Sequence, residues 1–169
     1  MSSLKTIANR YEIGPLLGRG GMGAVYQGVD LQTQEPVAIK VLRPELVYQA
    51  PELIERFRRE GEALQKLNHP NIVKVLAALE VEGQPYLIME YVGGGTLGDL
   101  LKNQPRLPLE RALAIALELT DALTRTHHLN IIHRDIKPSN VLLAEDGTPR
   151  LTDFGPANVE LYRRARWLP

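Results

Sequence analysis

A carboxylate, an ammonium group and an amide lie close together in the segment HRDIKPSN, residues 133–140. Asp135 could accept a proton from a hydroxyl group or orient that hydroxyl as a nucleophile. Lys137 could neutralise a transferring phosphate, and the side-chain oxygen of Asn140 suits a hard cation. Each residue alone would be ordinary in a loop, and His133 alone is more typical of a packed or capping histidine than of a catalyst. A chance origin of eight residues in this order is negligible, so we expect these side chains to act together.

A second acidic group follows at Asp153, in the Asp-Phe-Gly segment at 153–155. The intervening residues 141–152 are typical of a hairpin with a turn at Asp146-Gly147. Such a hairpin would return the chain to the segment 133–140, where Asp153 and Asn140 together could hold Mg²⁺ or Mn²⁺. The alternative is an ordinary Asp-x-Gly turn that binds no ion.

The segment GRGGMGAV, residues 18–25, matches the pattern G-x-G-x-x-G-x-V. Glycine backbone can approach a phosphate closely because it has no Cβ and tolerates positive φ. A plain glycine-rich turn would match the pattern equally well. A dinucleotide-binding turn would need a helix directly after the glycines, whereas AVYQGVD at 24–30 is strand-like. The pattern therefore favours a hairpin that closes over a ligand.

Lys40 ends the run VAIK, which is typical of a buried strand. Its ammonium group could simply extend into solvent, or it could contact nucleotide phosphates while a helical carboxylate holds it in place. Glu60 is the candidate carboxylate, because Phe57 and Leu64 flank it on an apolar helix face where a carboxylate needs a partner. The competing carboxylates on that helix are Glu55 and Glu62.

The elements that would position these residues follow from hydrophobic periodicity. The β-branched and apolar runs predict a β-rich first part, and a Gly93-Gly94-Gly95 connection separates it from a mostly helical second part. Leu109, Leu113, Ala116, Leu117 and Leu123 form an apolar stripe on the longest helix. Strands are expected over 11–18, 24–30 and 36–42, a hairpin over 72–92 with its turn at 82–84, and helices over 51–67, 97–103 and 109–130.

The composition of the 169 residues is that of an ordinary globular protein, with 44% hydrophobic and 24% charged residues. The formal net charge is zero, so no overall field attracts nucleic acid or an anionic membrane. The absence of cysteine excludes disulfides, thiolate metal sites and a cysteine nucleophile. No signal peptide and no membrane-length apolar run is visible. We therefore expect a cytoplasmic protein with no nucleic-acid partner and no membrane segment.

From about residue 11 to residue 155 these motifs resemble the protein kinase domain, specifically bacterial serine/threonine kinases with the eukaryotic-like fold. The resemblance implies an α+β, protein-kinase-like fold of two lobes. The N-lobe would be an antiparallel sheet with one main helix, and the C-lobe would be helical and incomplete. ATP with Mg²⁺ or Mn²⁺ would be the cofactors. The acceptor would be a protein Ser or Thr, because Lys137 follows Asp135 by two residues, as in the Ser/Thr class.

The resemblance also implies roles for individual residues. The catalytic set would be Asp135 as the base, Lys137, Asn140, and the ion pair of Lys40 with Glu60. Asn140 and Asp153 would be the metal ligands. Met89 would be the gatekeeper of the adenine pocket. The nucleotide-binding residues would be Leu17, Gly18, Arg19, Gly20, Gly21, Met22, Gly23, Ala24, Val25, Ala38, Lys40, Met89, Glu90, Val92 and Leu142.

The chain departs from the family pattern after Gly155. Residues 153–169 contain no Ser or Thr that could be phosphorylated, and no A-P-E-like anchor follows. We therefore expect a kinase domain truncated after Asp-Phe-Gly, with a tail read after the coding frame was lost. A short amphipathic helix, capped by Asn158 and packing Leu161 and Trp167, is the alternative for this tail. The predicted divisions are an N-terminal extension at 1–10, an N-lobe at 11–92, a partial C-lobe at 93–155 and an atypical tail at 156–169.

Two other functions stay open at this point. An ATP-binding but inactive fragment, or a pseudokinase-like module, would fit the truncation, although no catalytic residue is substituted. A small-molecule kinase of the aminoglycoside-phosphotransferase type shares the His-x-Asp and Asn spacing. Lys137 and the complete glycine pattern argue against the second of these.

Overall fold

The structure of the chain is a computed structural model that describes residues 6–21, 23–49 and 51–154. The predicted tail at 156–169, its capping Asn158 and the predicted nucleotide residue Met22 lie outside the described residues. Internal contacts divide the described chain into two compact units. The first holds 6–65 and 75–91, and the second holds 66–74 and 92–154. The segment 66–74 thus groups with the second unit, although the sequence suggested one continuous boundary near residue 92.

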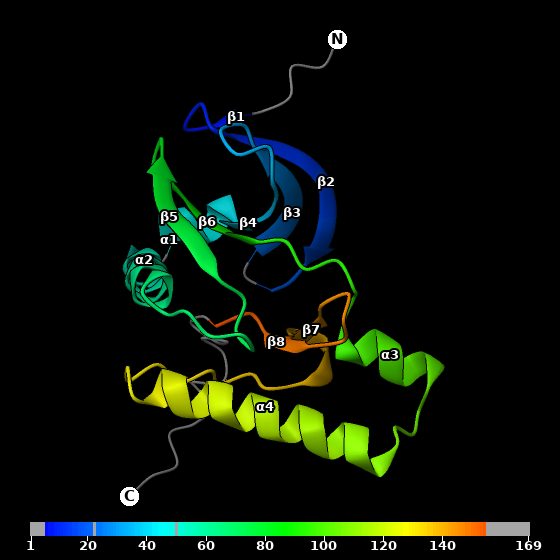
Figure 1. The fold of residues 1–169 in the computed structure, drawn as a ribbon. Helices are drawn as coiled ribbons and strands as arrows, with labels where there is room; N and C mark the ends of the chain where they lie inside the picture. The colour runs from blue at the N-terminus through cyan, green and yellow to red at the C-terminus, as the bar shows by residue number, and fades with distance from the viewer. Residues whose placement is uncertain (1–5, 22, 50, 155–169) are drawn as a thin grey trace, which may run out of the picture. The chain divides into compact units, whose positions relative to one another are not determined.

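The first unit is built on an antiparallel sheet of six strands in the order β1-β2-β3-β4-β6-β5 (Figure 1). The strand-rich runs of the sequence form these strands because their β-branched and aromatic residues pack well on a pleated surface. The predicted strands and the hairpin with its turn at Glu82-Gly83 are confirmed. The strands are β1 (Thr6–Ile7), β2 (Tyr11–Arg19), β3 (Gly23–Asp30), β4 (Pro36–Leu42), β5 (Val75–Val81) and β6 (Gln84–Glu90).

One face of this sheet carries the hydrophobic core of the first unit. Ile39 on β4 is paired directly with Ile88 on β6, and both side chains are 0% exposed. Alternate residues along each strand point to this face, so the pattern of period two places the apolar set together. The buried members of the cluster are Ile7, Tyr11, Val37, Ile39, Tyr86 and Ile88.

Two helices follow β4 in the first unit. The helix α2 (Pro51–Gln65) confirms the predicted helix over 51–67, whereas the short α1 (Pro44–Gln49) was not predicted. Gly61 lies where α2 packs on the sheet, since a Cβ at this position would come within 2.7 Å of the Leu87 side chain. Phe57 and Leu64 are buried, as their helical spacing predicted.

The residues that we expected to form an N-terminal extension include β1, which pairs with β2. Ile7 is 1% exposed and belongs to the core cluster. The connection between β1 and β2 contains a turn that the Arg10 N–H closes by donating to the Ile7 carbonyl at 3.0 Å. The central residues Ala8 and Asn9 have positive φ values of 51° and 53°, the left-handed geometry of a type I′ turn. Part of the segment 1–10 is therefore integral to the sheet, because its single isoleucine fills a core position.

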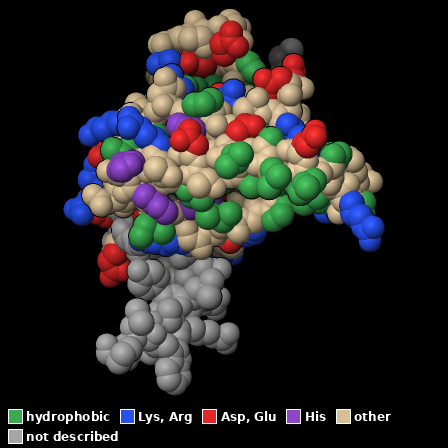
Figure 2. All heavy atoms as spheres, turned by 60° about the horizontal axis from the view of Figure 1, so that its bottom comes forward, with side chains coloured by type: hydrophobic (Ala, Val, Ile, Leu, Met, Phe, Trp, Pro, Cys, Tyr) green, Lys and Arg blue, Asp and Glu red, His purple; other side chains and the backbone are tan. Residues whose placement is uncertain are grey.

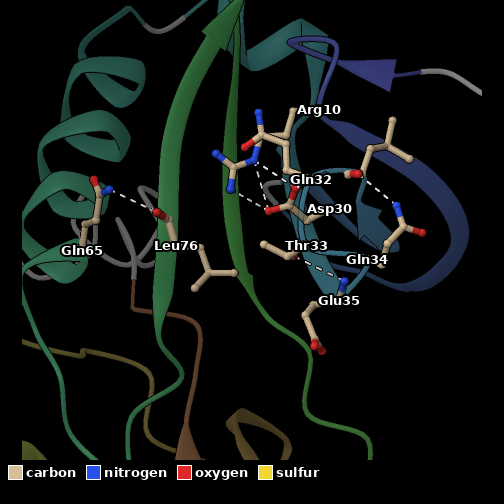
Figure 3. A network of polar contacts seen from close by, with 9 residues as sticks. Arg10, Asp30, Gln32, Thr33, Gln34, Glu35, Gln65 and Leu76 are labelled. Carbon is tan, nitrogen blue, oxygen red and sulfur yellow. Dashed lines mark hydrogen bonds and ion pairs between the residues drawn. The ribbon is translucent and has the colours of Figure 1, made fainter.

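An ion pair fastens this turn to the end of β3 (Figure 3). The Arg10 guanidinium donates to both carboxylate oxygens of Asp30, at 3.0 Å from Nε to Oδ1 and 2.7 Å from Nη2 to Oδ2. The Asp30 carboxylate also accepts the backbone N–H of Gln32 at 3.0 Å. The guanidinium carbon lies 5.0 Å from the centre of the Tyr11 ring. These contacts lower the pKa of Asp30, with the hydrogen bond from Arg10 as the main cause.

Replacing Asp30 by asparagine should destabilise the chain near neutral pH but much less in acid. The pKa of Asp30 is lower in the folded chain than in the unfolded chain. The contribution of the Asp30 carboxylate to the free energy of unfolding is therefore complete above its unfolded-state pKa of about 3.9. This contribution is lost as the pH falls from that value towards the folded-state pKa. Urea midpoints of the wild type and Asp30→Asn should differ at about pH 7 and converge towards about pH 3. The exposed Glu35→Gln is the control, and a gap that does not depend on pH would contradict the assignment.

The second unit combines two helices with a small hairpin. The helix α3 (Leu97–Asn103) begins at Thr96, whose hydroxyl accepts the N–H of Asp99 at 3.0 Å. The long helix α4 (Leu109–His127) leads to a loop, a 3₁₀ turn at Pro138–Asn140, and the strands β7 (Val141–Leu143) and β8 (Pro149–Leu151). Gly147 has a φ of 83° in the hairpin turn, as the Asp-Gly pair predicted. Both predicted helices and the hairpin are thus confirmed.

The predicted apolar stripe of α4 lies largely on its exposed side. Leu109, Leu113 and Leu117 are 73%, 54% and 71% exposed, while Ile115 and Ala122 on the other side are buried. Figure 2 shows hydrophobic side chains gathered along this surface. Among the described residues, no helix is both long and apolar enough to cross a bilayer.

Candidate active site

The loop that follows α4 in the second unit places the three polar side chains of the predicted catalytic set together. The Lys137 ammonium donates to Asp135 Oδ2 at 2.7 Å, and Asn140 Nδ2 donates to the same oxygen at 3.0 Å. Asn140 Nδ2 also donates to the Asp135 backbone carbonyl at 2.8 Å. These bonds, with Lys137 the larger cause, lower the pKa of Asp135. The Asp135 carboxylate is thus ionised at neutral pH and held in one orientation.

His133 connects this loop to the segment that carries Asp153. Its Nε2 lies 2.7 Å from the carbonyl oxygen of Thr152, and its Nδ1 accepts the N–H of Asp135 at 3.3 Å. Since a carbonyl can only accept, Nε2 carries the proton and the ring is the neutral Nε2–H tautomer. His133 is 1% exposed, and this burial lowers its pKa. The ring also contacts the Phe154 ring in a tilted arrangement, with centroids 4.6 Å apart and 58° between the ring planes.

His133 therefore has the packed role that the sequence favoured for it, but it also holds two functional segments at once. Sequence reasoning did not assign it to the site, and neither did it assign Thr152, whose N–H donates to the Asn140 carbonyl at 3.0 Å. In the sequence, only the place of His133 in the motif could have indicated this role. The contact itself joins residues 19 positions apart, which no local pattern reveals.

The predicted metal ligands Asn140 and Asp153 both lie in the second unit, and their chemistry suits a hard divalent cation. The amide nitrogen of Asn140 is used by Asp135, so its Oδ1 is the atom left for a cation. Asp153 follows Thr152 with a φ of 61°, a backbone geometry found at constrained sites. Among the described residues no group of three or more His, Cys, Asp or Glu could hold a metal ion. Magnesium commonly binds one or two protein oxygens together with phosphates and water, so this pair fits it.

The glycine turn of the first unit joins β2 and β3. Gly18 and Arg19 pair with Val25 and Ala24, and the N–H of Gly20 donates to the Gly23 carbonyl at 2.9 Å. A Cβ at Gly23 would lie 2.0 Å from the Val41 carbonyl oxygen, so the close approach of β4 requires glycine here. Arg43 donates to the carbonyl of Gly21. The exposed residues at the end of β2 and in the turn that follows are Leu17, Gly18, Arg19, Gly20 and Gly21.

Lys40 and the predicted nucleotide residues around it share the face of the sheet opposite the core cluster. Lys40 pairs with Val25 on one side and Leu87 on the other, while Ala38 pairs with Met89. Directly paired residues point to the same face, and so do residues two apart. Because α2 packs on Leu87 through Gly61, the neighbouring Glu60 lies on the helix that covers the Lys40 face. The Lys40–Glu60 ion pair stays a prediction.

The remaining predicted nucleotide residues lie at strand ends. Glu90 ends β6 in the first unit, whereas Val92 belongs to the second unit. Leu142 lies on β7, half-buried, where it pairs with Arg150 and bridges to Thr96. These residues thus belong to different units, and the adenine contacts predicted for them stay predictions.

Comparison with known proteins decides the family. A family profile described as "Protein kinase domain" matches residues 11–164. The chain belongs to the protein kinase domain family. The match covers both units of this kinase domain and extends beyond Gly155 into the segment 156–169, whose origin stays a prediction.

Named relatives and a solved structure agree with this assignment. A probable serine/threonine-protein kinase of Streptomyces coelicolor is 42% identical over 163 residues, covering 94% of this chain and 24% of the relative. The serine/threonine-protein kinase PknB of Mycobacterium tuberculosis is 38% identical over 163 residues, with 94% and 26% covered. The crystal structure of the PknI kinase domain of M. tuberculosis matches with a TM-score of 0.80 and 34% identity, covering 94% of this chain and 64% of that domain.

This kinase domain spans about a quarter of the length of the curated relatives it matches. The fold predicted from the sequence, a kinase-like α+β fold with an antiparallel N-lobe sheet and an incomplete helical C-lobe, is confirmed. Members of the family use ATP and a divalent metal ion. The relatives are named serine/threonine kinases, which agrees with the class predicted from Lys137.

Proposed function

We propose that this chain carries the nucleotide-binding and catalytic groups of a bacterial serine/threonine protein kinase, which transfers the γ-phosphoryl group of Mg-ATP to a Ser or Thr hydroxyl of a protein. The observation that carries the proposal is that the Asp135 carboxylate accepts hydrogen bonds from Lys137 and from Asn140. These are the three polar groups that a kinase catalytic loop brings together for phosphoryl transfer. Cytoplasmic location belongs to the same proposal.

In this proposal Asp135 orients the acceptor hydroxyl and takes its proton as the bond to phosphorus forms. Lys137 holds the Asp135 carboxylate at 2.7 Å and places a positive charge beside the hydroxyl. Asn140 Oδ1 and the Asp153 carboxylate would hold the metal ion, which when bound neutralises charge on the transferring phosphate. Lys40, oriented by Glu60, contacts phosphate oxygens of the nucleotide.

The residues of the first unit would bind the rest of the nucleotide. The glycine turn at 18–23 offers backbone N–H groups to the phosphates because no Cβ blocks the approach. Val25 and Ala38 present small apolar surface to the adenine ring, and Glu90 offers its backbone. Met89 is 6% exposed, which suits a side chain that limits the depth of a pocket.

Mg-ATP should raise the melting temperature of the chain, and Lys40→Met should abolish the rise. At about 100 times its dissociation constant a ligand stabilises a protein by about 2.7 kcal/mol, which corresponds to about 5–10 °C for a chain of this size. Differential scanning fluorimetry measures the shift. Lys66→Met, which removes an exposed lysine, is the control and should keep the full response. The absence of any shift in a cooperatively melting wild type would refute the proposal.

The alternative is a module that binds ATP without transferring phosphate. The observation that favours it is that the chain covers 64% of the solved kinase domain. Radiolabelled transfer from γ-labelled ATP to a generic protein substrate separates the two functions. Transfer to Ser or Thr supports the kinase, whereas a Mg-ATP shift without any transfer supports the binding module.

A further inference from the structure

The buried residue Asn71, in the segment between α2 and β5, joins three parts of the second unit. It is 5% exposed. Its Nδ2 donates to the Pro149 carbonyl at 2.9 Å and to Glu118 Oε2 on α4 at 2.7 Å. Its backbone carbonyl accepts the N–H of Leu151 at 2.8 Å. Asn71 therefore bonds to both ends of β8 and links that strand to α4.

The neighbours of Asn71 extend this contact into a strand pairing. Ile72 forms a parallel bridge with Leu151, and the N–H of Val73 donates to the Leu151 carbonyl at 2.9 Å. Ile72 and Leu151 are 3% and 0% exposed. Since β7 pairs with the other edge of β8, the strand is held on both sides. The next two residues are Thr152 and Asp153, so the fixed strand ends at the proposed metal ligand.

The chemistry at position 71 requires a side chain that donates two hydrogen bonds. A peptide carbonyl and a carboxylate face the amide, and both only accept. A carboxylate of the same shape would supply no donor and would add charge repulsion with Glu118. The backbone N–H of Asn71 is satisfied separately, by His69 Nδ1 at 3.1 Å. The side chain is thus committed to β8 and α4, whereas a simple turn residue would need neither contact.

We infer that Asn71 is a positioning residue for Asp153: by fixing β8 against α4 it places the carboxylate that would hold the metal ion. The inference rests on the proposed function, because it concerns a ligand of the proposed metal site. Asn71 acts on Asp153 through Leu151 and Thr152. The N–H of Thr152 donates to the carbonyl of Asn140, the other proposed metal ligand.

The decisive variant is Asn71→Asp, which keeps the shape and removes the donors. Asn68→Asp makes the same change at an exposed position of the same segment and is the matched control. Glu118→Gln should be tolerated alone, because its amide oxygen can still accept from Asn71. Added to Asn71→Asp, it returns a donor that can face the new carboxylate and should recover part of the loss. Asn71→Ser, which keeps one donor, replaces the variant if Asn71→Asp does not fold.

Hydrogen exchange and magnesium titration are the two readouts. In Asn71→Asp the amides of Leu151 and Thr152 should exchange about tenfold faster below the melting temperature, the scale of one lost hydrogen bond to a charged group. The amides of Ala122 in α4 and Ile88 in the first unit should be unchanged. The Mg²⁺ concentration that gives half of the ATP-dependent thermal shift should also rise about tenfold, and Asn68→Asp should match the wild type.

Unchanged exchange at Thr152 would overturn the inference. Equal acceleration at Thr152 and Ala122 would also overturn it, because Asn71 would then merely stabilise the unit. If the wild type gives no thermal shift with Mg-ATP, the proposed function fails by itself. In that case the exchange of Thr152 relative to Ala122 still decides whether Asn71 positions the Asp153 segment.

Discussion

Replacing Asp135 by asparagine is expected to lower the rate of phosphoryl transfer by about a hundredfold or more, the scale of a lost general base. The amide can still accept from Lys137, so the loop keeps its shape while the proton acceptor is lost. The rate is best measured in single-turnover assays on a chimera in which residues 1–155 replace the matching part of the Streptomyces coelicolor relative. In the unsubstituted chimera, protonation of Asp135 should not slow the reaction until the pH is below about 4, because the pKa of this carboxyl group is lowered.

Two controls make the Asp135 result specific. Asp146→Asn makes the same chemical change in the exposed hairpin turn, where the Asp146 carboxylate accepts the N–H of Thr148 at 2.8 Å, and should leave the rate unchanged. The ATP-dependent thermal shift should survive Asp135→Asn, since this residue is assigned to the acceptor hydroxyl. Turnover near the unsubstituted rate would remove Asp135 from the mechanism.

Replacing Ile39 by alanine should destabilise the chain by about 2–5 kcal/mol, the range for a fully buried isoleucine cut back to a methyl group. The side chain is 0% exposed and faces Ile88 across the sheet, so the lost volume leaves a cavity. Urea unfolding, followed by fluorescence, should show a lower midpoint with an unchanged slope. Leu31→Ala, at a residue 40% exposed, is the control and should have a much smaller effect. A loss below about 1 kcal/mol at Ile39 would mean that the core collapses around the gap.

Local patterns predicted the strands and helices of this kinase domain well. The helix at 97–103 was predicted at its observed bounds, because its apolar residues lie within one short segment. The helix α1 was missed because six residues carry too little periodicity to register. The strand β1 was missed because it has only two residues, and the burial of Ile7 depends on strands that follow it.

In the candidate site, too, some residues were predicted from a local motif and others were missed. The motif order identified Asp135, Lys137 and Asn140, and the structure brings these three together. The supporting contacts of His133 and Asn71 were not predicted, because they depend on partners far along the chain. Asn71 meets Pro149 across 78 positions. No periodicity within one segment could indicate such a contact.

The pairing of 71–73 with β8 also determines the order in which the chain can fold during synthesis. Every strand of the first sheet has been made once Glu90 leaves the ribosome, so that sheet can form early. Ile72 and Val73 must wait for Leu151, and Asn71 waits for Pro149 across 78 positions. At 5–20 residues per second this delay is roughly 4–16 s. A nascent chain therefore holds a finished sheet while Ile72 and Val73 still lack their partner Leu151 for several seconds, and during that interval chaperone binding to 71–73 would compete with misassembly.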